Sequence, residues 1–183
     1  MKLREIFKNA ININEAWDTK FDEIEWFTTP SGYAAKARRD NDLFELYLDS
    51  YTYTVGSRVY NWVNIAFSRF VNGEKRQDIL GLPVNQSKNI GCVINGLRDG
   101  MKKYVGSDTI DAIVFMVKPG EERRVSIYEK LLHSNILRLS SWKVFKKVES
   151  QHGTFLIAIQ SGMTKDERDG LEAQILSHGK ILT

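Results

Sequence analysis

The chain has 183 residues, a formal net charge of +3 and a single cysteine, Cys92. Its 42% hydrophobic and 27% charged residues are typical of a globular protein, and its length suits a single domain at 1–183. One cysteine excludes an internal disulfide and favours a reducing compartment, so we expect a cytoplasmic protein. The apolar runs are too short to span a bilayer, and the initial MKLREIFKNA lacks the apolar core of a signal peptide. The mild positive charge permits an anionic partner without requiring one.

The first half of the chain predicts an antiparallel meander. Residues 1–22 show no clear period, and we expect them to form a short cap. Apolar and polar residues then alternate, and the alternation is interrupted by turn signals such as Asn72-Gly73, a strong hairpin marker. The expected strands are 24–29, 32–39, 43–55 and 59–70.

Residues 78–132 predict a β-loop-α-β-α crossover unit. A short apolar strand at 78–82 leads into a polar loop at 85–91, and the following helix is indicated by the spacing of Ile90, Val93, Leu97 and Met101. The nearly continuous apolar run 110–117 predicts a strand covered on both faces, and a second helix follows Pro119-Gly120. We expect the two strands to be parallel and to separate at their carboxyl ends, which is a common position for a ligand.

The chain closes with a strand pair and a helix. Segments 142–150 and 153–160 predict the strands, and a capping box of Thr164 and Glu167 predicts the start of a helix within 163–183. The whole order predicts an α+β fold whose mixed central sheet is antiparallel at its start and parallel at its middle.

In element order, residues 60–160 resemble the GNAT superfamily of acyl-CoA-dependent N-acyltransferases. The family holds the pyrophosphate of its cofactor in a loop of pattern Gln/Arg-x-x-Gly-x-Gly/Ala. Asn89 stands here where the family has its first glycine. The resemblance implies that acetyl-CoA is held by the corresponding stretch, which consists of Gln86, Ser87, Lys88, Asn89, Ile90 and Gly91.

The same resemblance implies a catalytic role for Tyr128. In the family, a tyrosine on the helix after the second crossover strand protonates the departing thiolate. This chain departs from the family pattern at Leu132-His133, where the family has Gly-Phe. It also has Glu121 and Arg124 where the family has asparagine and alanine. GNAT-like domains that depart from the pattern in this way occur among bacteriophage proteins, which would place the protein in the host cytoplasm or the virion.

Several residues have two interpretations. Acyl transfer to an amine needs a general base, and the candidates are Asp78, Glu45, Asp49 and His133. A solvated surface group is the preferred interpretation of each. Tyr128 is interpreted alternatively as a core residue, and the 85–91 loop as a mere connection.

Cys92 has either a pKa lowered by the helix dipole or a packing role. No histidine pair has metal-ligand spacing, so we expect no metal site.

Two functions follow from these patterns. The first is transfer of an acyl group from acyl-CoA to an amine. The alternative is a non-catalytic GNAT-like binding protein of phage type, in which aromatic residues of the meander contact a host or virion macromolecule. A nucleic-acid surface is a weaker alternative, drawn from the basic pairs Arg38-Arg39, Lys102-Lys103, Arg123-Arg124 and Lys146-Lys147.

Overall fold

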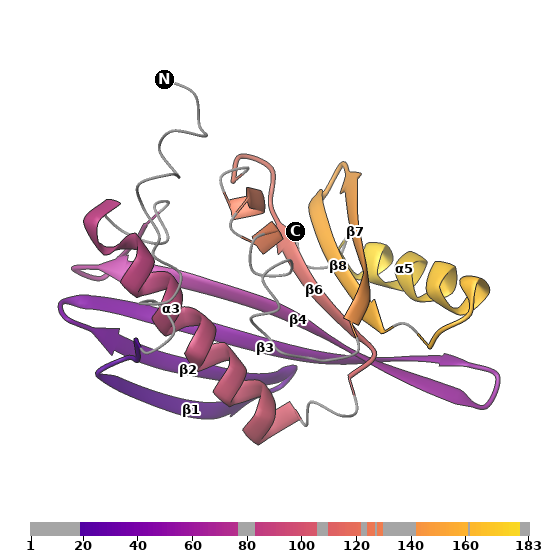
Figure 1. Ribbon diagram of the computed structural model, residues 1–183, viewed down its shortest axis with the longest axis horizontal. Helices are drawn as coiled ribbons and strands as arrows, with labels where there is room; N and C mark the ends of the chain where they lie inside the picture. Colours follow the sequence, from indigo (N-terminus) through magenta and orange to yellow (C-terminus); the bar gives the residue numbers. More distant parts are fainter. Residues whose placement is uncertain are drawn as a thin grey trace.

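Within the described residues, the chain forms one mixed sheet with a long helix on each face (Figure 1). The computed structural model describes residues 19–76, 83–105, 110–121, 124–126, 128–129, 142–160 and 162–179. The strand order is β1-β2-β3-β4-β6-β8-β7, and β5 pairs with β4 beside this path. Only the β4–β6 pair is parallel among the described strands; the other neighbours are antiparallel. The predicted α+β class with a mixed sheet is therefore confirmed.

The predicted meander is confirmed with nearly the expected strand limits. Its strands are joined by tight turns, one of them at Asn72-Gly73, where both residues have positive φ. Asparagine and glycine tolerate this conformation at little cost. The strands are β1 (Glu23–Thr29), β2 (Gly32–Arg39), β3 (Asp42–Val55), β4 (Arg58–Val71) and the short β5 (Glu74–Lys75).

Helix α3 (Pro83–Gly100) covers one face of the meander and continues into a π-helical turn at Met101–Val105. The predicted apolar spacing is confirmed, because Ile90, Val93, Leu97 and Met101 are all buried against that face. The core beneath them comes from alternate positions of the strands, among them Phe44, Leu46, Leu48, Val63, Ile65 and Phe67. None of the helices in the described parts of the chain is long and apolar enough to cross a membrane.

Along the chain, the second half supplies the predicted strands β6 (Ala112–Val117), β7 (Trp142–Ser150) and β8 (Gly153–Gln160), and β8 lies between β6 and β7 in the sheet. Helix α5 (Lys165–Gly179) packs on the face opposite α3, where Leu171 and Ile175 meet side chains of β4, β6 and β8.

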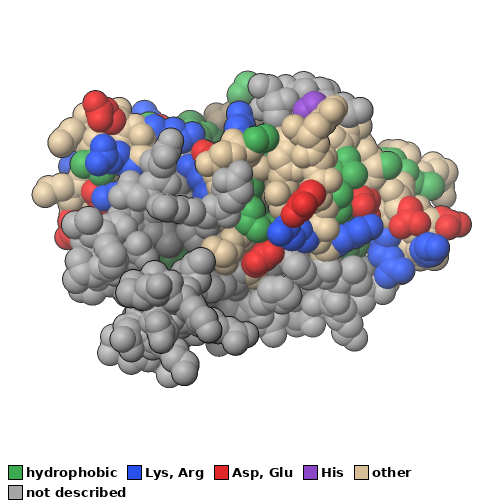
Figure 2. Space-filling model, turned by 90° about the horizontal axis from the view of Figure 1, so that it is seen from above, with side chains coloured by type: hydrophobic (Ala, Val, Ile, Leu, Met, Phe, Trp, Pro, Cys, Tyr) green, Lys and Arg blue, Asp and Glu red, His purple; other side chains and the backbone are tan. Residues whose placement is uncertain are grey.

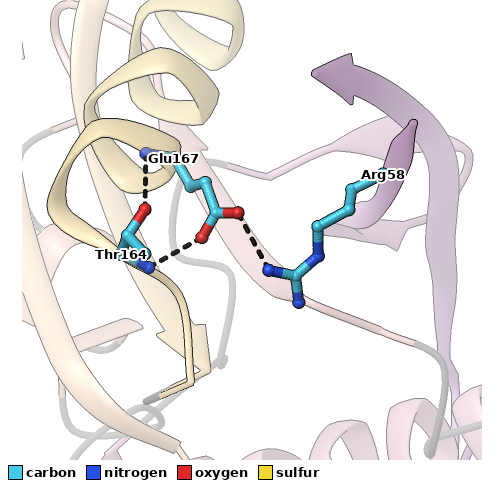
Figure 3. A network of polar contacts seen from close by, with 3 residues as sticks. All are labelled: Arg58, Thr164 and Glu167. Atoms are coloured by element: carbon cyan, nitrogen blue, oxygen red, sulfur yellow. Dashed lines mark hydrogen bonds and ion pairs between the residues drawn. The ribbon is translucent and has the colours of Figure 1, made fainter. Parts of the chain in front are cut away.

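The predicted capping box begins α5 (Figure 3). The Thr164 backbone N–H donates to the Glu167 carboxylate at 2.8 Å, and the Glu167 backbone N–H donates to the Thr164 hydroxyl at 3.4 Å. The same carboxylate forms an ion pair with Arg58 at 2.9 Å, which ties the first residue of β4 to the helix.

Two sequence predictions about the crossover unit are wrong. The parallel partner of β6 is β4, which we had placed in the antiparallel meander, whereas the predicted strand 78–82 lies outside the described residues. The reason is burial: Trp62, Val63, Asn64 and Ile65 are all buried, so the middle of β4 is covered on both faces as a central strand must be.

The second error concerns the predicted loop at 85–91, which is helical. Helix α3 begins at Pro83, because proline has its φ already fixed for the first helical position and needs no backbone N–H there. The stretch assigned to a phosphate-binding loop therefore lies in the first half of the helix.

Candidate functional site

The two parallel strands part after a very short pairing. β4 and β6 are paired only at Trp62↔Ala112, Val63↔Ile113 and Asn64↔Val114. Beyond this point β4 continues to Val71 and β6 to Val117, and Figure 1 shows β4 running to the left while β6 turns upward. The expected separation of two parallel strands is present, with β4 taking the place of 78–82. We call the point beyond Asn64 and Val114, where β4 and β6 separate, the junction.

Tyr128 packs against both sides of the junction. Its ring stacks on Phe115 of β6, with ring centroids 4.5 Å apart, and meets the edge of Phe67 of β4 at 5.6 Å. The side chain belongs to the described helical residues after β6 and is only 1% exposed. The interpretation of Tyr128 as a core residue is therefore supported by its surroundings.

Burial controls the acidity of Tyr128. It raises the pKa of the phenol to about 12, while the neighbouring Arg124 guanidinium pulls the pKa the other way. Arg124 is itself buried; its Nη1 donates to the Phe67 carbonyl at 3.4 Å, and its Nε lies 3.5 Å from the Glu121 carboxylate. A phenol with this pKa stays protonated at neutral pH and is a weaker proton donor than an unperturbed tyrosine.

The residues expected to hold acetyl-CoA do not form an exposed cradle. Asn89 and Ile90 are 3% and 7% exposed, and Gly91 is buried beside them under the sheet. In an α-helix that starts at Pro83, the N–H groups of these residues are bonded to carbonyls one turn earlier, so they are not available to a pyrophosphate. These three residues therefore do not fit the predicted role. The side chains of Gln86, Ser87 and Lys88, and the whole of Asp78 and His133, lie outside the described parts of the chain.

The other two candidate bases, Glu45 and Asp49, lie on the face of β3 opposite α3. Glu45 accepts a hydrogen bond from the Tyr47 hydroxyl at 2.5 Å, and Asp49 accepts one from the Ser31 hydroxyl at 2.5 Å. Burial, and then the bond to Glu45, raises the pKa of Tyr47 to about 12. Burial and the Asp49 charge raise the pKa of Tyr51. The carboxylates of Glu45 and Asp49 therefore lie on the same face of β3, four residues apart. Tyr128 lies on the opposite face of the sheet, which α3 covers.

Sequence reasoning missed Asn64, which lies opposite Asp49 in the β3–β4 register and is 7% exposed. Its Oδ1 is buried and has no hydrogen-bond partner among the described residues. Because Asn64 is also the last residue of β4 paired with β6, it lies at the junction. The signal was available in the sequence, where an amide interrupts the apolar stretch WVNIAF.

Several residues of the basic pairs are engaged with other groups. Lys146 pairs with Glu172 at 2.5 Å, Lys147 pairs with Glu149 at 3.3 Å, and Arg39 donates to the Lys20 carbonyl at 2.6 Å. Figure 2 shows acidic and basic side chains interleaved on the face it presents. In the described residues, this distribution gives no continuous basic surface on that face.

Cys92 packs as a small apolar residue. It is fully buried in α3, and burial raises the pKa of its thiol, although the Arg39 guanidinium 3.2 Å from its Sγ opposes the rise. The alternative of a lowered pKa is therefore wrong. The part of the chain that the structure describes contains no group of His, Cys, Asp and Glu side chains able to hold a metal ion.

Searches among protein-family models, curated proteins and solved structures found no match to this chain.

Proposed function

We propose that this chain is a non-catalytic binding protein with a GNAT-like strand arrangement. The observation that supports the proposal most directly is the position of Tyr128. Its ring packs between Phe67 and Phe115, one from each of the two strands that separate at the junction. In an acyltransferase of this fold, the same separation admits the thioester arm of the cofactor. We infer that the Tyr128 ring fills part of the corresponding space in this chain.

The strand order supports the GNAT-like arrangement itself. An antiparallel meander is joined through one parallel pair to an antiparallel pair at the far edge, and the crossover between the parallel strands includes α3. This is the element order on which the resemblance rests. Acyl transfer from acetyl-CoA to an amine remains the second candidate, because the parallel strands do separate after Asn64 and Val114.

We propose that a partner contacts the meander face opposite α3, on the side of β1 and β2. Helix α5 covers one end of this face, where it meets Tyr51 and Tyr53 of β3, and its other packing partners belong to β4, β6 and β8. Phe27 is 44% exposed, and Leu43, Tyr47 and Phe70 are half-buried on the same face by their strand register. Aromatic residues that are partly exposed on a flat face favour contact with a macromolecule. We propose that a host or virion component binds here.

A thermal-shift titration with acetyl-CoA tests the proposal. A ligand that binds only the folded state raises the melting temperature by mass action, with about 2.7 kcal/mol of stabilisation at a ligand concentration of about 100 Kd. We expect no shift at millimolar acetyl-CoA. Pantetheine serves as the matched control, because it has the thiol arm without the phosphates. A saturable shift with acetyl-CoA alone would overturn the binding-protein proposal and support the acyltransferase.

A further inference from the structure

One transverse row of the sheet places several oxygen atoms side by side on the face opposite α3. The register aligns Thr29 with Gly32, Gly32 with Asp49, and Asp49 with Asn64. Residues directly opposite in a sheet have their side chains on the same face, about 5 Å apart between neighbouring strands. Gly32 contributes no side chain to the row, and a Cβ atom added there would overlap the backbone carbonyl of Leu48. We call these residues the oxygen row.

Asp49 carries the negative charge at the centre of the oxygen row. Asp49 is half-buried and accepts one hydrogen bond, from the Ser31 hydroxyl. Among the described residues, Asp49 has no ion pair with a lysine or arginine. Lys36, the nearest basic residue in the register, lies opposite Glu45 and not opposite Asp49. A partly desolvated carboxylate without a cation favours a positively charged ligand.

Polar side-chain oxygens at both ends of the oxygen row lack a hydrogen-bond donor among the described residues. The Asn64 Oδ1 and the Thr29 Oγ1 are both buried, and neither has a hydrogen-bond partner among the described residues. Asn64 is more than nine-tenths buried and lies directly opposite Asp49 in the β3–β4 register. Buried acceptors without donors are uncommon in folded proteins, and each calls for an explanation such as an ordered water, an ion or a ligand that supplies the donor. The two oxygens are three strand spacings apart, roughly 14 Å, so a single small group bound at Asp49 can reach only the Asn64 oxygen.

Aromatic rings flank the row along β3. Tyr47 and Tyr51 stand two residues to either side of Asp49, so their side chains share its face. Tyr51 is held by stacking on Trp62, with ring centroids 4.3 Å apart. The negative face of an aromatic ring attracts a cation within about 6 Å. The surroundings of Asp49 therefore combine one negative charge, neutral acceptors and aromatic walls.

We propose that the oxygen row binds a primary ammonium group. Such a group offers N–H donors to the Asp49 carboxylate and the Asn64 amide oxygen, and its adjoining methylenes would lie against the tyrosine rings. A divalent metal fits less well, because only one carboxylate lies in the row and hard cations favour several. The inference rests on the proposed binding function, since it names the chemical group that the partner presents.

Isothermal titration of the full chain with two probes tests the inference. Putrescine is the free amine, and a short peptide containing one lysine, acetylated at its amino terminus, is the protein-borne amine; 1,4-butanediol and the same peptide with norleucine are the uncharged controls. We expect saturable binding of at least one amine and none of the controls. Binding of putrescine alone identifies a free amine, and binding of the peptide alone identifies a lysine side chain. Failure of both amines to bind overturns the inference.

Variants locate the site. Asp49→Asn should weaken amine binding at least tenfold, whereas Glu149→Gln, which removes an exposed carboxylate on β7, should leave it unchanged. Asn64→Leu should weaken binding and raise the melting temperature of the free protein, because it removes a buried amide oxygen that lacks a donor. Equal affinity of the parent, Asp49→Asn and Asn64→Leu proteins overturns the inference. The titrations contain no acetyl-CoA, so their outcome is independent of the test of the proposed function.

Discussion

Glu167 shows how one side chain can join local and long-range structure. Its carboxylate accepts the Thr164 N–H at the start of α5 and pairs with Arg58 at the start of β4 (Figure 3). The nearby Tyr60 hydroxyl, then the Thr164 N–H and hydroxyl, and also Arg58, lower the pKa of Glu167 to about 2. An acidic group at a helix amino terminus is additionally favoured by the helix dipole.

The lowered pKa predicts a specific acid dependence of stability. The folded pKa lies below the unfolded value of about 4.5, so the ionised carboxylate stabilises the fold above pH 4.5 and this contribution is lost as the pH falls toward 2. Glu167→Gln should lower the melting temperature at pH 6, and the difference from the parent should shrink between pH 4.5 and 2. Glu149→Gln, at an exposed carboxylate, should show little difference at either pH. A difference for Glu167→Gln that stays constant with pH would contradict this account.

Two substitutions at Tyr128 separate the contribution of its ring to the free energy of unfolding from that of its hydroxyl. Tyr128→Phe keeps the packing on Phe67 and Phe115 and should cost no more than about 1–2 kcal/mol. Tyr128→Ala removes the ring from a buried site and should cost about 3–5 kcal/mol. Urea denaturation measures both values. A cost below about 1 kcal/mol for Tyr128→Ala would show that the ring does not fill the junction.

At the scale of elements, the turns follow directly from residue type. Gly153 begins β8 with a φ of 132°, which strongly favours glycine. A Cβ atom added there would overlap the backbone carbonyl of Val117, because β6 lies directly against the start of β8. Gly56 also has a positive φ, of 58°, yet an added Cβ there would meet nothing within 4 Å.

These two glycines predict different costs for the same substitution. Gly153→Ala should lower the free energy of unfolding by about 2–4 kcal/mol, since backbone strain and steric overlap both contribute. Gly56→Ala should cost only the strain of a left-handed residue, about 1–2 kcal/mol. Chemical denaturation of both variants gives the comparison. Equal costs would mean that the close approach of β6 and β8 relaxes without penalty.

In the two helices, some features depend only on residues close together in the sequence, and others depend on burial against the sheet. The apolar spacing of α3 and the capping box of α5 were both readable from the sequence, because they depend on residues three or four positions apart. The start of α3 at Pro83 was missed, since a glycine and several polar residues in 85–91 were interpreted as a loop. Burial of Asn89 and Ile90 against the sheet outweighs that local composition.

At the scale of the whole molecule, β4 decides how the two halves are joined. It pairs with β3 from Arg58 to Phe70 and with β6 over three residue pairs, so it is the strand shared by the meander and the second half. The pairing Trp62↔Ala112 links residues 50 positions apart. The junction, with Tyr128 packed in it, exists only because of this pairing.

The sequence by itself determined the strands of the meander, the Asn72-Gly73 turn, the closing strand pair and the capping box of α5, because alternation, turn residues and helix caps act over a few neighbouring positions. It also predicted a parallel pair that separates. Only the tertiary structure decided that β4 is the partner of β6, that Tyr128 lies buried between them, and that Asn64 faces Asp49. The physical reason is that strand neighbours and buried contacts are selected by the packing of the complete core, to which residues distant in the chain contribute together.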